Sequence, residues 1–170
     1  MDEKIIIREY ESPCGRLMLG SLCGKLCLCD WQEALHRDRV LSRLRKHLKT
    51  EFHEGSSAVI ELAVKQLNEY FSGERIEFEI PLMFVGTDFQ KLVWNELLSI
   101  PYGKTISYRE LAANIGRPES VRAVANANGA NSLSIFTPCH RVVGSDGTLT
   151  GYAGGLPAKQ YLLSLETTRR

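Results

Sequence analysis

The chain has 170 residues, of which 44% are hydrophobic and 24% are charged, and its net charge is +1. This balance is typical of a soluble globular protein, and it excludes a disordered chain, a collagen and a coiled coil. There is no run of about 18 apolar residues and the first residues do not form a signal peptide, so the sequence predicts a cytoplasmic protein without membrane contact.

The two halves of the chain differ in charge. Residues 1–88 contain 12 Lys and Arg against 15 Asp and Glu, a balance of −3, whereas residues 89–170 contain 9 against 5, a balance of +4. A positive excess favours contact with an anion such as nucleic acid. The C-terminal half is therefore the better candidate for nucleic-acid binding.

The N-terminal half begins with three short apolar segments, which are separated by turn-forming residues. These segments are "KIIIREY" (4–10), "RLMLGSL" (16–22) and "LCLCDW" (26–31), and they predict a small antiparallel sheet. Leucines at helical spacing then predict a helix over 35–48. A second apolar stripe predicts a helix over 57–71 that ends at Ser72-Gly73.

The segment "IEFEIPLMF" (76–84) resembles a strand that leads into an irregular linker around Pro81 and Gly86. We place a domain boundary in this linker. The sequence thus predicts an α+β fold, with an α/β structural domain over 1–86 and a mainly helical domain over 87–170.

Helices dominate the pattern beyond the linker. Thr87 or Asp88 can cap a helix through "FQKLVWNELLSI", which stops at Pro101-Tyr102-Gly103. Ser107 and Glu110 then form a capping box, because each side chain can accept from the backbone N–H of the other residue.

The helix that begins at this capping box should end at Gly116, and a second short helix should follow over 119–130. Two helices joined by a turn of about three or four residues form a helix-turn-helix, which often places its second helix in a DNA groove. Plain packing of one helix on another explains the same pattern. Both interpretations remain open at this point.

The second helix of this pair is rich in small residues. They allow close approach either of a neighbouring helix or of a phosphodiester backbone, with Arg122 as the only long side chain in the segment. Asn126, Asn128 and Asn131 add hydrogen-bonding groups that suit contacts or turns. The small residues are Ala123, Ala125, Ala127, Gly129 and Ala130.

Cys23, Cys27 and Cys29 invite a zinc site, with Cys14 upstream. Their spacing differs from the usual Cys-x2-Cys pattern. In a strand, Cys27 and Cys29 would share one face, and small buried thiols explain them. We therefore expect no metal.

Cys139 lies in the stretch "FTPCHRVVG" (136–144). Thr137 is an acceptable N-cap and Pro138 is favoured at the first helical position, so the pattern predicts Cys139 in the first turn of a short helix. The helix dipole, with His140 and Arg141 nearby, would lower the pKa of the thiol and favour a thiolate.

His140 is a candidate general base for Cys139. Adjacent side chains do not normally point the same way, so contact through a water molecule is easier than direct contact. Glu166 in the last predicted helix could orient the imidazole as a third member. From spacing alone, a Cys-His pair such as this is more often not catalytic.

Four stretches together resemble the O6-alkylguanine-DNA alkyltransferases, also called methylated-DNA-protein-cysteine methyltransferases, of bacterial type. They are "ISYRELAANIGRP", "VRAVANANGAN", "PCHRVVG" and "GYAGGLPAKQYLLSLE". The resemblance implies an N-terminal ribonuclease H-like domain and a C-terminal helix-turn-helix domain. It also implies DNA repair by stoichiometric, single-turnover transfer of an alkyl group from O6 of guanine, and from O4 of thymine, to the protein's own cysteine.

By this resemblance Cys139 is the alkyl acceptor, while His140, through a water, and Glu166 remove the thiol proton. Asn131 braces the active-site turn. Arg122 is the finger that fills the gap left by the extruded base, and extrusion is needed because a stacked O6 cannot reach a buried sulfur.

Tyr108 displaces the adjacent phosphate and offers its hydroxyl to N3 of the base. The resemblance assigns further contacts to DNA and to the base, and it implies no cofactor and a monomer that acts on double-stranded DNA containing O6-alkylguanine. The DNA contacts are Tyr108, Arg122, Ala123, Ala127 and Asn128, and the base pocket is Val142, Gly151, Tyr152, Ala153 and Gly154.

The sequence departs from the family pattern at five places, which concern groove fit, turn rigidity and tolerance of bulky alkyl groups. Two rival functions remain beside repair: a helix-turn-helix transcriptional regulator with an incidental cysteine, and a cysteine hydrolase built on Cys139 and His140. The departures are Ala125, Asn126, Ser132, Thr137 and Ala153.

Overall fold

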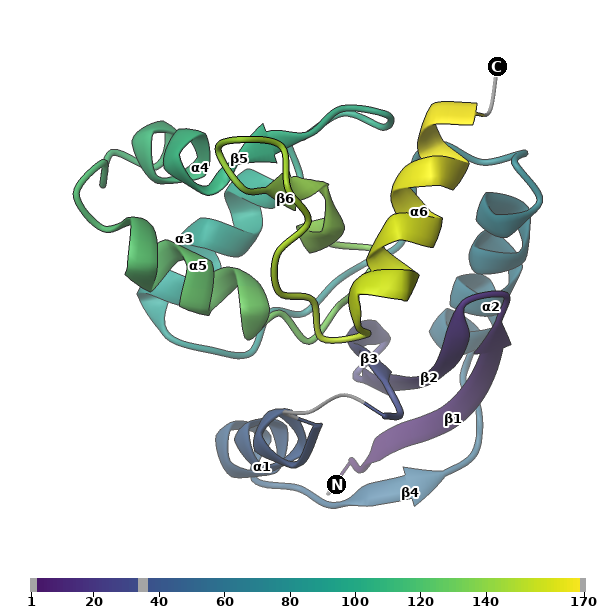
Figure 1. Ribbon diagram of the computed structural model, residues 1–170. Coiled ribbons are helices and arrows are strands. Elements are labelled where there is room, and N and C mark those ends of the chain that lie inside the picture. The colour runs from purple at the N-terminus through teal and green to yellow at the C-terminus, as the bar shows by residue number, and fades with distance from the viewer. Residues whose placement is uncertain (1–2, 34–36, 169–170) are drawn as a thin grey trace.

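A four-stranded sheet opens the chain (Figure 1) in this computed structural model, which describes residues 3–33 and 37–168. The first three strands form the predicted antiparallel meander, and a short fourth strand pairs parallel with β1, so the sheet is mixed. The order across the sheet is β3-β2-β1-β4. The strands are β1 (Ile5–Ser12), β2 (Gly15–Leu22), β3 (Lys25–Trp31) and β4 (Phe52–Glu54).

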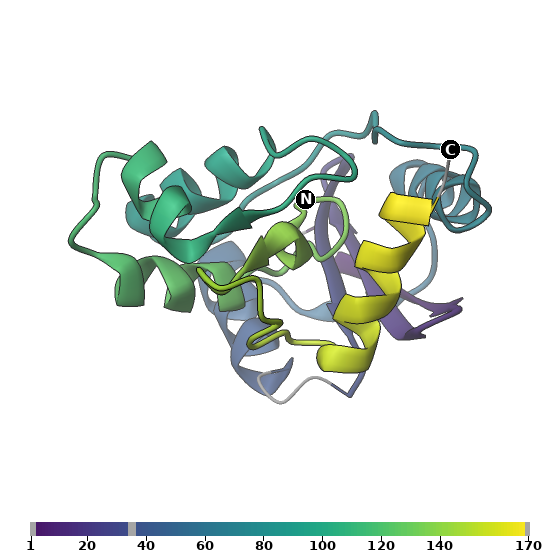
Figure 2. The ribbon, with the colours of Figure 1, turned by 45° about the horizontal axis from the view of Figure 1, so that its top comes forward.

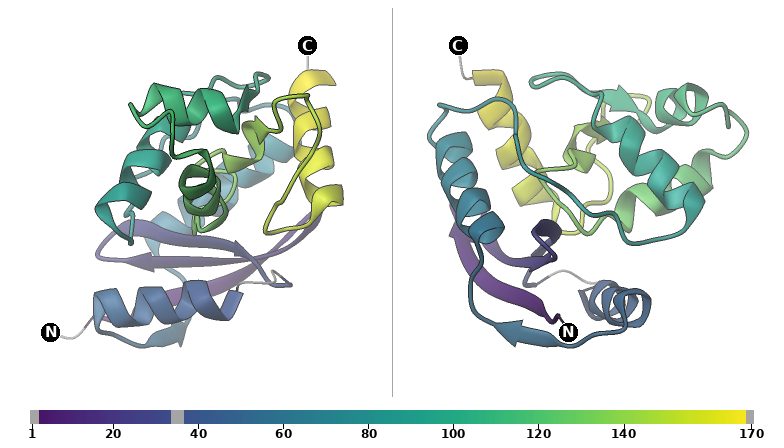
Figure 3. Two further views of the ribbon diagram at one scale, coloured as in Figure 1. Left: turned by 60° about the vertical axis from the view of Figure 1, so that its left-hand side comes forward. Right: turned by 180° about the vertical axis from the view of Figure 1, so that it is seen from behind.

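Two helices cover the sheet from different sides, α1 (Arg37–Leu48) and α2 (Ala58–Phe71). Ser57 caps α2 by accepting from the Ile60 N–H. Helix α2 packs on β2 and β3, whereas α1 packs on Leu28 in a separate apolar cluster, and Figure 3 shows the sheet between the two helices. Both predicted helices are confirmed, and Leu35 at the expected start of the first lies outside the described residues.

A β-bulge in β3 changes the faces of its cysteines. Gly20 pairs with Leu28 and Ser21 with Leu26, which leaves Cys27 as the extra residue. Cys27 packs toward α1 and Cys29 toward α2, so the expectation that they share a face is wrong. Both thiols are buried.

The segment 76–84 is not a strand, contrary to the sequence-based prediction. Only Leu82 forms a β-bridge, with Leu26 on the edge of β3. The Leu26 N–H donates to the Pro81 carbonyl at 2.9 Å, and the Met83 N–H donates to the Leu26 carbonyl at 2.8 Å. Proline removes one ladder donor at this point, so the extended chain protects the sheet edge without joining it.

The C-terminal half is mainly helical, as predicted, and its first two helices begin at the predicted caps. Thr87 and Gln90 form a capping box at α3, and Ser107 and Glu110 form another at α4. Gly116 has φ +75°, the left-handed conformation that ends α4 before the turn into α5. The elements are α3 (Asp88–Leu97), β5 (Ile106–Ser107), α4 (Tyr108–Asn114), α5 (Val121–Gly129), η1 (Cys139–Arg141), β6 (Val142–Val143) and α6 (Leu156–Thr168).

The two halves share one apolar core. Leu133 and Phe136 from the segment before η1, and Leu162 from α6, pack in the same cluster as α2 and the inner face of the sheet. Helix α6 accordingly lies between α2 and the other C-terminal helices (Figures 1 and 2). The N-terminal half therefore supports the segment that carries Cys139 directly.

Asp30 on β3 is a carboxylate 3% exposed, and neither of its oxygens has a hydrogen-bond partner of ordinary geometry among the described residues. Burial raises the pKa of Asp30 to about 6 from 3.8, against the opposing charges of Arg43 and Arg37. The unfolded chain therefore loses this proton at lower pH than the folded chain does. Ionisation of Asp30 should lower the stability of the fold progressively between these two pKa values.

Asp30→Asn is expected to raise the free energy of unfolding at pH 7 by up to about 3 kcal/mol, while leaving it nearly unchanged near pH 4. Urea unfolding of both proteins across this range measures the difference. Asp38→Asn removes an exposed carboxylate of α1 and should reproduce the parent curve. An equal gain at both pH values for Asp30→Asn would refute the ionisation argument.

Candidate active site

The segment 131–139 forms a turn that docks on the edge of β3. The Cys29 N–H donates to the Ser132 carbonyl at 2.7 Å, and the Ser134 N–H donates to the Cys29 carbonyl at 2.9 Å. These bonds extend the edge of the sheet by one residue of the turn, Leu133. The N-terminal sheet is therefore the platform on which the turn is built.

Asn131 lies buried inside this turn and spans it. Its Nδ2 donates to the Thr137 carbonyl at 2.9 Å, and its Oδ1 accepts from the Leu133 N–H at 2.9 Å. Ile135 within the turn has φ +75°, a left-handed conformation that costs a β-branched residue on the order of 1–3 kcal/mol. Because Ile135 is buried and its neighbours are hydrogen-bonded, the surrounding structure holds this strain in place.

Cys139 begins a single 3-10 turn, η1, instead of the expected helix. Pro138 occupies the N-cap position without a side-chain cap, and the buried Thr137 hydroxyl has no partner among the described residues, so Thr137 is not the cap that was predicted. A three-residue turn supplies little helix dipole. Burial raises the pKa of the Cys139 thiol, although Asn131 and Lys159 act in the opposite direction. The predicted thiolate is therefore wrong, and the resting protein holds a thiol that needs a base.

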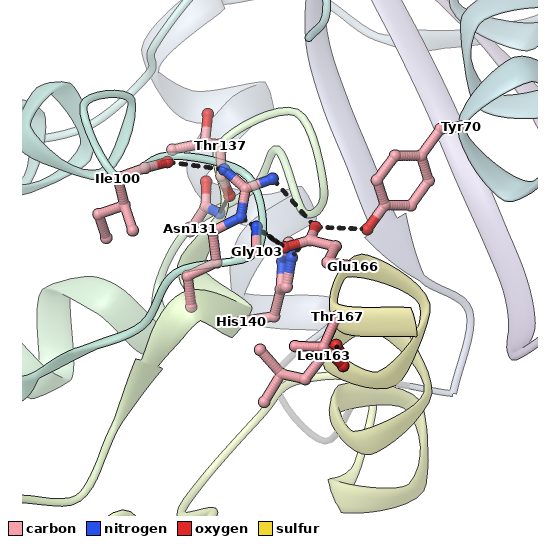
Figure 4. A network of polar contacts seen from close by, with 10 residues as sticks. Tyr70, Ile100, Gly103, Asn131, Thr137, His140, Leu163, Glu166 and Thr167 are labelled. Carbon is pink, nitrogen blue, oxygen red and sulfur yellow. Dashed lines mark hydrogen bonds and ion pairs between the residues drawn. The ribbon is translucent and has the colours of Figure 1, made fainter. Parts of the chain in front are cut away.

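Glu166 is the centre of a buried polar network (Figure 4). His140 Nε2 lies 2.7 Å from Glu166 Oε2, and the Tyr70 hydroxyl donates to the same oxygen at 2.6 Å. Arg141 donates from Nε to Oε1 at 2.8 Å and from Nη2 to Oε2 at 3.0 Å. All four residues are at most 6% exposed. The structure thus brings Glu166 and His140 together, as the sequence predicted.

The charges in this network define its protonation. Burial would raise the pKa of Glu166, but the contacts with His140 and Arg141 outweigh burial and hold the pKa below its ordinary value. Burial lowers the pKa of His140 despite its bond to Glu166, so at neutral pH the imidazole is neutral and Arg141 is the cation that balances Glu166. An ionised carboxylate only accepts, so His140 must carry its proton on Nε2.

His140 Nδ1 is consequently the atom with a free lone pair. It is buried and has no hydrogen-bond partner among the described residues. A neutral imidazole oriented by a carboxylate, with its second nitrogen open, is the arrangement of a general base. The chemistry that this arrangement supports is removal of a proton from a nearby acid such as the Cys139 thiol.

Lys159 is a site residue that the sequence-based reasoning missed. It is fully buried, and its Nζ donates to the carbonyls of Val142 at 2.6 Å and Thr150 at 2.9 Å. Burial lowers the pKa of Lys159, and Cys139 acts in the opposite direction. A signal was present, because Lys159 and Glu166 share the buried stripe of α6 with Leu162, where charged residues are rarely placed.

A groove of about 770 Å³ lies between α5 and the loop 150–153, and Cys139 itself is not among the residues that line it. Tyr108, Arg122 and Tyr152 line it, together with the small residues of α5. Tyr108 and Tyr152 also pack on the cluster that contains Cys139, which connects the floor of the groove to the thiol. The Tyr108 hydroxyl donates to the Thr150 carbonyl at 3.3 Å.

Helix α5 turns only part of its surface toward the groove and solvent. Arg122, Ala123 and Asn126 are exposed, whereas Ala127 and Asn128 are buried. Asn128 Nδ2 points at the Cys139 carbonyl at 3.5 Å. The helical period turns Ala127 inward, and it does not line the groove, whereas Asn128 lines the groove although it is only 4% exposed. The predicted DNA contacts at both positions stay predictions.

The predicted base-pocket residues divide in the same way. Gly151, Tyr152 and Ala153 line the groove, whereas Val142 and Gly154 do not. Val142 is buried in β6, where it holds Lys159 through its carbonyl. A Cβ at Gly154 would lie 2.6 Å from the Trp31 indole, so this position requires glycine. The loop thus rests on the N-terminal sheet.

Residues from both halves hold the C-terminal end of α5. Trp94 Nε1 donates to the Ala127 carbonyl at 2.8 Å, and Arg43 of α1 donates to the Ala130 carbonyl at 2.6 Å. The Arg43 guanidinium lies 5.4 Å from the centre of the Trp94 ring. A cation at this end also complements the helix dipole, so α1 helps to orient α5.

Within residues 3–33 and 37–168 no cluster of His, Cys, Asp or Glu can hold a metal ion, and no helix is long and apolar enough to cross a membrane. All five cysteines are free thiols. Cys23 is exposed and Cys14 is half-buried, in addition to the buried Cys27 and Cys29 of β3.

Comparison with known proteins links this geometry to a family. Residues 5–84 match the model of the 6-O-methylguanine DNA methyltransferase ribonuclease-like domain, and residues 88–168 match that of the 6-O-methylguanine DNA methyltransferase DNA binding domain. The constitutive methylated-DNA-protein-cysteine methyltransferase of Bacillus subtilis is 52% identical over 164 residues, which cover 96% of this chain and 88% of the relative.

Two mycobacterial proteins support the same family. The methylated-DNA-protein-cysteine methyltransferase of Mycobacterium bovis is 46% identical over 151 residues, covering 89% of this chain and 91% of the relative. The crystal structure of Mycobacterium tuberculosis OGT in complex with DNA superposes with a TM-score of 0.84 at 43% identity, covering 96% of this chain and 94% of that one. Family models for both halves and relatives along nearly the whole length leave one assignment: the chain belongs to the 6-O-methylguanine DNA methyltransferase family.

Proposed function

We propose that this protein repairs DNA by moving an alkyl group, typically methyl, from O6 of guanine, or O4 of thymine, to Cys139. The observation that carries the proposal is the buried Cys139, which shares an apolar cluster with Tyr108 and Tyr152 of the groove and directly precedes His140, whose neutral imidazole is held by Glu166. Relatives with this activity in their names cover nearly the whole chain. The substrate is double-stranded DNA that contains the alkylated base.

The proposed reaction begins when the alkylated base leaves the helix stack and enters the groove, since a stacked base cannot reach a buried sulfur. His140 Nδ1 takes the thiol proton through a water molecule. The sulfur then forms a bond to the alkyl carbon as the carbon–oxygen bond breaks, and the electron pair of that bond stays on guanine. The Tyr108 hydroxyl donates a proton to N3, which neutralises the guanine. The proton that His140 took from the thiol finally returns to the Tyr108 oxygen.

We propose that each protein acts once. The product is a thioether, a poor leaving group, and the proposal includes no cofactor that would regenerate the thiol. We further propose a monomer in the cytoplasm. Five unpaired cysteines, two of them at least partly accessible, support a reducing compartment.

Arg122 supports the proposal that the base is extruded. Its side chain is exposed at the start of α5 and lines the groove, so it can enter the duplex as the base leaves. Tyr108 faces the same groove from the start of α4. Positive charge on this surface would also contact phosphates.

Arg122→Ala is expected to slow transfer from duplex DNA by about ten- to a hundredfold, because the gap left by the base is no longer filled. Transfer from a free O6-benzylguanine-type base should change by less than about threefold, since no duplex is opened. Single-turnover rates on both substrates measure the effect. Arg109→Ala, an exposed arginine outside the groove lining, is the control, and an equal loss on both substrates would contradict the finger role.

The proposed function is tested by incubation with a duplex that contains one O6-methylguanine, followed by mass spectrometry of the protein and the DNA. One methyl group on Cys139, with guanine restored, supports repair. An unmodified protein with an intact methylated base would favour the regulator. An unmodified protein with a repaired base would also refute transfer to Cys139.

A further inference from the structure

Tyr70 connects the N-terminal half to the network around Glu166. It lies in the last turn of α2, and its hydroxyl donates to Glu166 Oε2 at 2.6 Å (Figure 4). The two residues are 96 positions apart in the chain. The same carboxylate oxygen is the one that accepts from His140 Nε2 at 2.7 Å.

The Tyr70 hydroxyl is held in this position by its ring. Tyr70 is fully buried, and its ring packs on Phe71, Phe78 and Tyr102 with centroid distances of 5.2, 5.4 and 6.3 Å. Burial, and then the charge of Glu166, raise the pKa of Tyr70 well above its ordinary value. The hydroxyl therefore stays protonated and remains a donor to Glu166.

Three donors share Glu166 Oε2: the Tyr70 hydroxyl, Arg141 Nη2 and His140 Nε2. Each donor withdraws negative charge from the oxygen that the others use. A carboxylate oxygen that carries less charge stabilises an imidazolium less. Loss of the Tyr70 bond should therefore strengthen the pull of Glu166 on the His140 proton and leave the carboxylate less firmly oriented.

We propose that Tyr70 is a positioning residue for alkyl transfer: its hydroxyl orients the Glu166 carboxylate and keeps His140 neutral over a wider range of acidic pH. This inference rests on the proposed role of His140 as the base for Cys139. It gives the N-terminal half a direct part in the chemistry, in addition to its support of the fold.

Other charged groups also act on His140 and Glu166. Arg141 on η1 and Lys159 on α6 act on His140 as positive charges, and both oppose its protonation. Glu166 is the anion that favours protonation. Tyr70 does not change any of these charges, so its removal tests the hydrogen bond alone.

Tyr70→Phe in the full chain keeps the ring and deletes the hydroxyl. The single-turnover rate of methyl transfer should be measured from about pH 5 to pH 8, where a histidine base titrates. We expect the acidic limb of the profile to move to higher pH, with a loss of rate of roughly three- to tenfold at pH 6. The final yield should stay at one methyl group per protein.

Tyr10→Phe is the matched control. Tyr10 also donates its hydroxyl to a residue of α2, Asn68, at 2.7 Å, but it is remote from Glu166 in the hydrogen-bond network. Its variant should keep the parent pH profile. A Tyr70→Phe profile that coincides with the parent, or an equal shift in Tyr10→Phe, would overturn the proposal.

A second measurement needs no activity. Nuclear magnetic resonance of the His140 ring follows its protonation in the parent and in Tyr70→Phe, and we expect the pKa of His140 to be higher in the variant. No rise would overturn the role of Tyr70 even if transfer were slowed. If the pKa of His140 rises in Tyr70→Phe but the parent protein accepts no methyl group, the role of the contact is supported and the proposed function is refuted.

Discussion

Cys139→Ser is expected to abolish alkyl transfer completely while the affinity for duplex DNA stays within about threefold of the parent value. A serine hydroxyl is far less acidic than a thiol, and the buried site already raises the pKa of the Cys139 thiol. His140 can therefore not generate an alkoxide at a useful rate. The substitution is nearly isosteric and leaves the exposed face of α5 unchanged, so DNA binding should persist.

Mass spectrometry after overnight incubation with methylated duplex checks the first expectation, and fluorescence anisotropy with the same duplex checks the second. Cys27→Ser is the control, because it changes another buried thiol that packs toward α1. It should accept one methyl group per folded protein. A methyl group on any residue of the Cys139→Ser variant would show that another nucleophile accepts it.

Local signals in the sequence were sufficient to predict where the main helices lie. Thr87 and Ser107 cap α3 and α4 as predicted, Gly116 ends α4, and Ser57, the first residue of the predicted helix 57–71, is the cap of α2. Each cap depends on hydrogen bonds between residues only a few positions apart, which a pattern of residue types can represent. The helix-turn-helix was predictable for this reason.

The strands were less predictable where they depend on distant partners. Strand β4 has only three residues, and it exists because 52–54 lies beside β1. The segment 76–84 has a strand-like composition but forms a single bridge at Leu82. Composition does not show which sheet edge a segment will meet, so tertiary contacts decided both outcomes.

The state of Cys139 could not be predicted from its neighbours in sequence. The expected thiolate depended on the dipole of a helix that is only one 3-10 turn long, whereas the dominant effect is burial, which depends on the whole fold. Tyr70 and Lys159 were missed for a related reason. Their roles arise only when α2 and α6 pack beside the turn.

The net charge of the N-terminal half concealed a basic helix, α1. The N-terminal half has a balance of −3, yet its helix α1 is strongly basic. Arg43 of that helix holds the Ala130 carbonyl at the end of α5. Net charge over a long segment averages such local concentrations away, so the charge count gave no sign that a basic helix of the N-terminal half contacts α5.

Glu166→Gln is expected to lower the rate of transfer by about a hundredfold or more and to reduce the free energy of unfolding by about 3–5 kcal/mol. An amide can donate as well as accept, so it no longer defines the Nε2–H form of His140. It also removes the anion that balances Arg141, which is 6% exposed, and a buried cation without a partner is costly. Single-turnover kinetics and urea unfolding measure the two effects.

A double variant separates these effects. Arg141→Met together with Glu166→Gln removes both charges, so it should recover most of the lost stability but not the lost rate, because His140 still lacks its carboxylate. Glu110→Gln changes an exposed carboxylate of the α4 capping box and should leave transfer unchanged. If the double variant regained the parent rate, the effect of Glu166 on transfer would be one of stability alone, and His140 would need no anionic partner to act as the base.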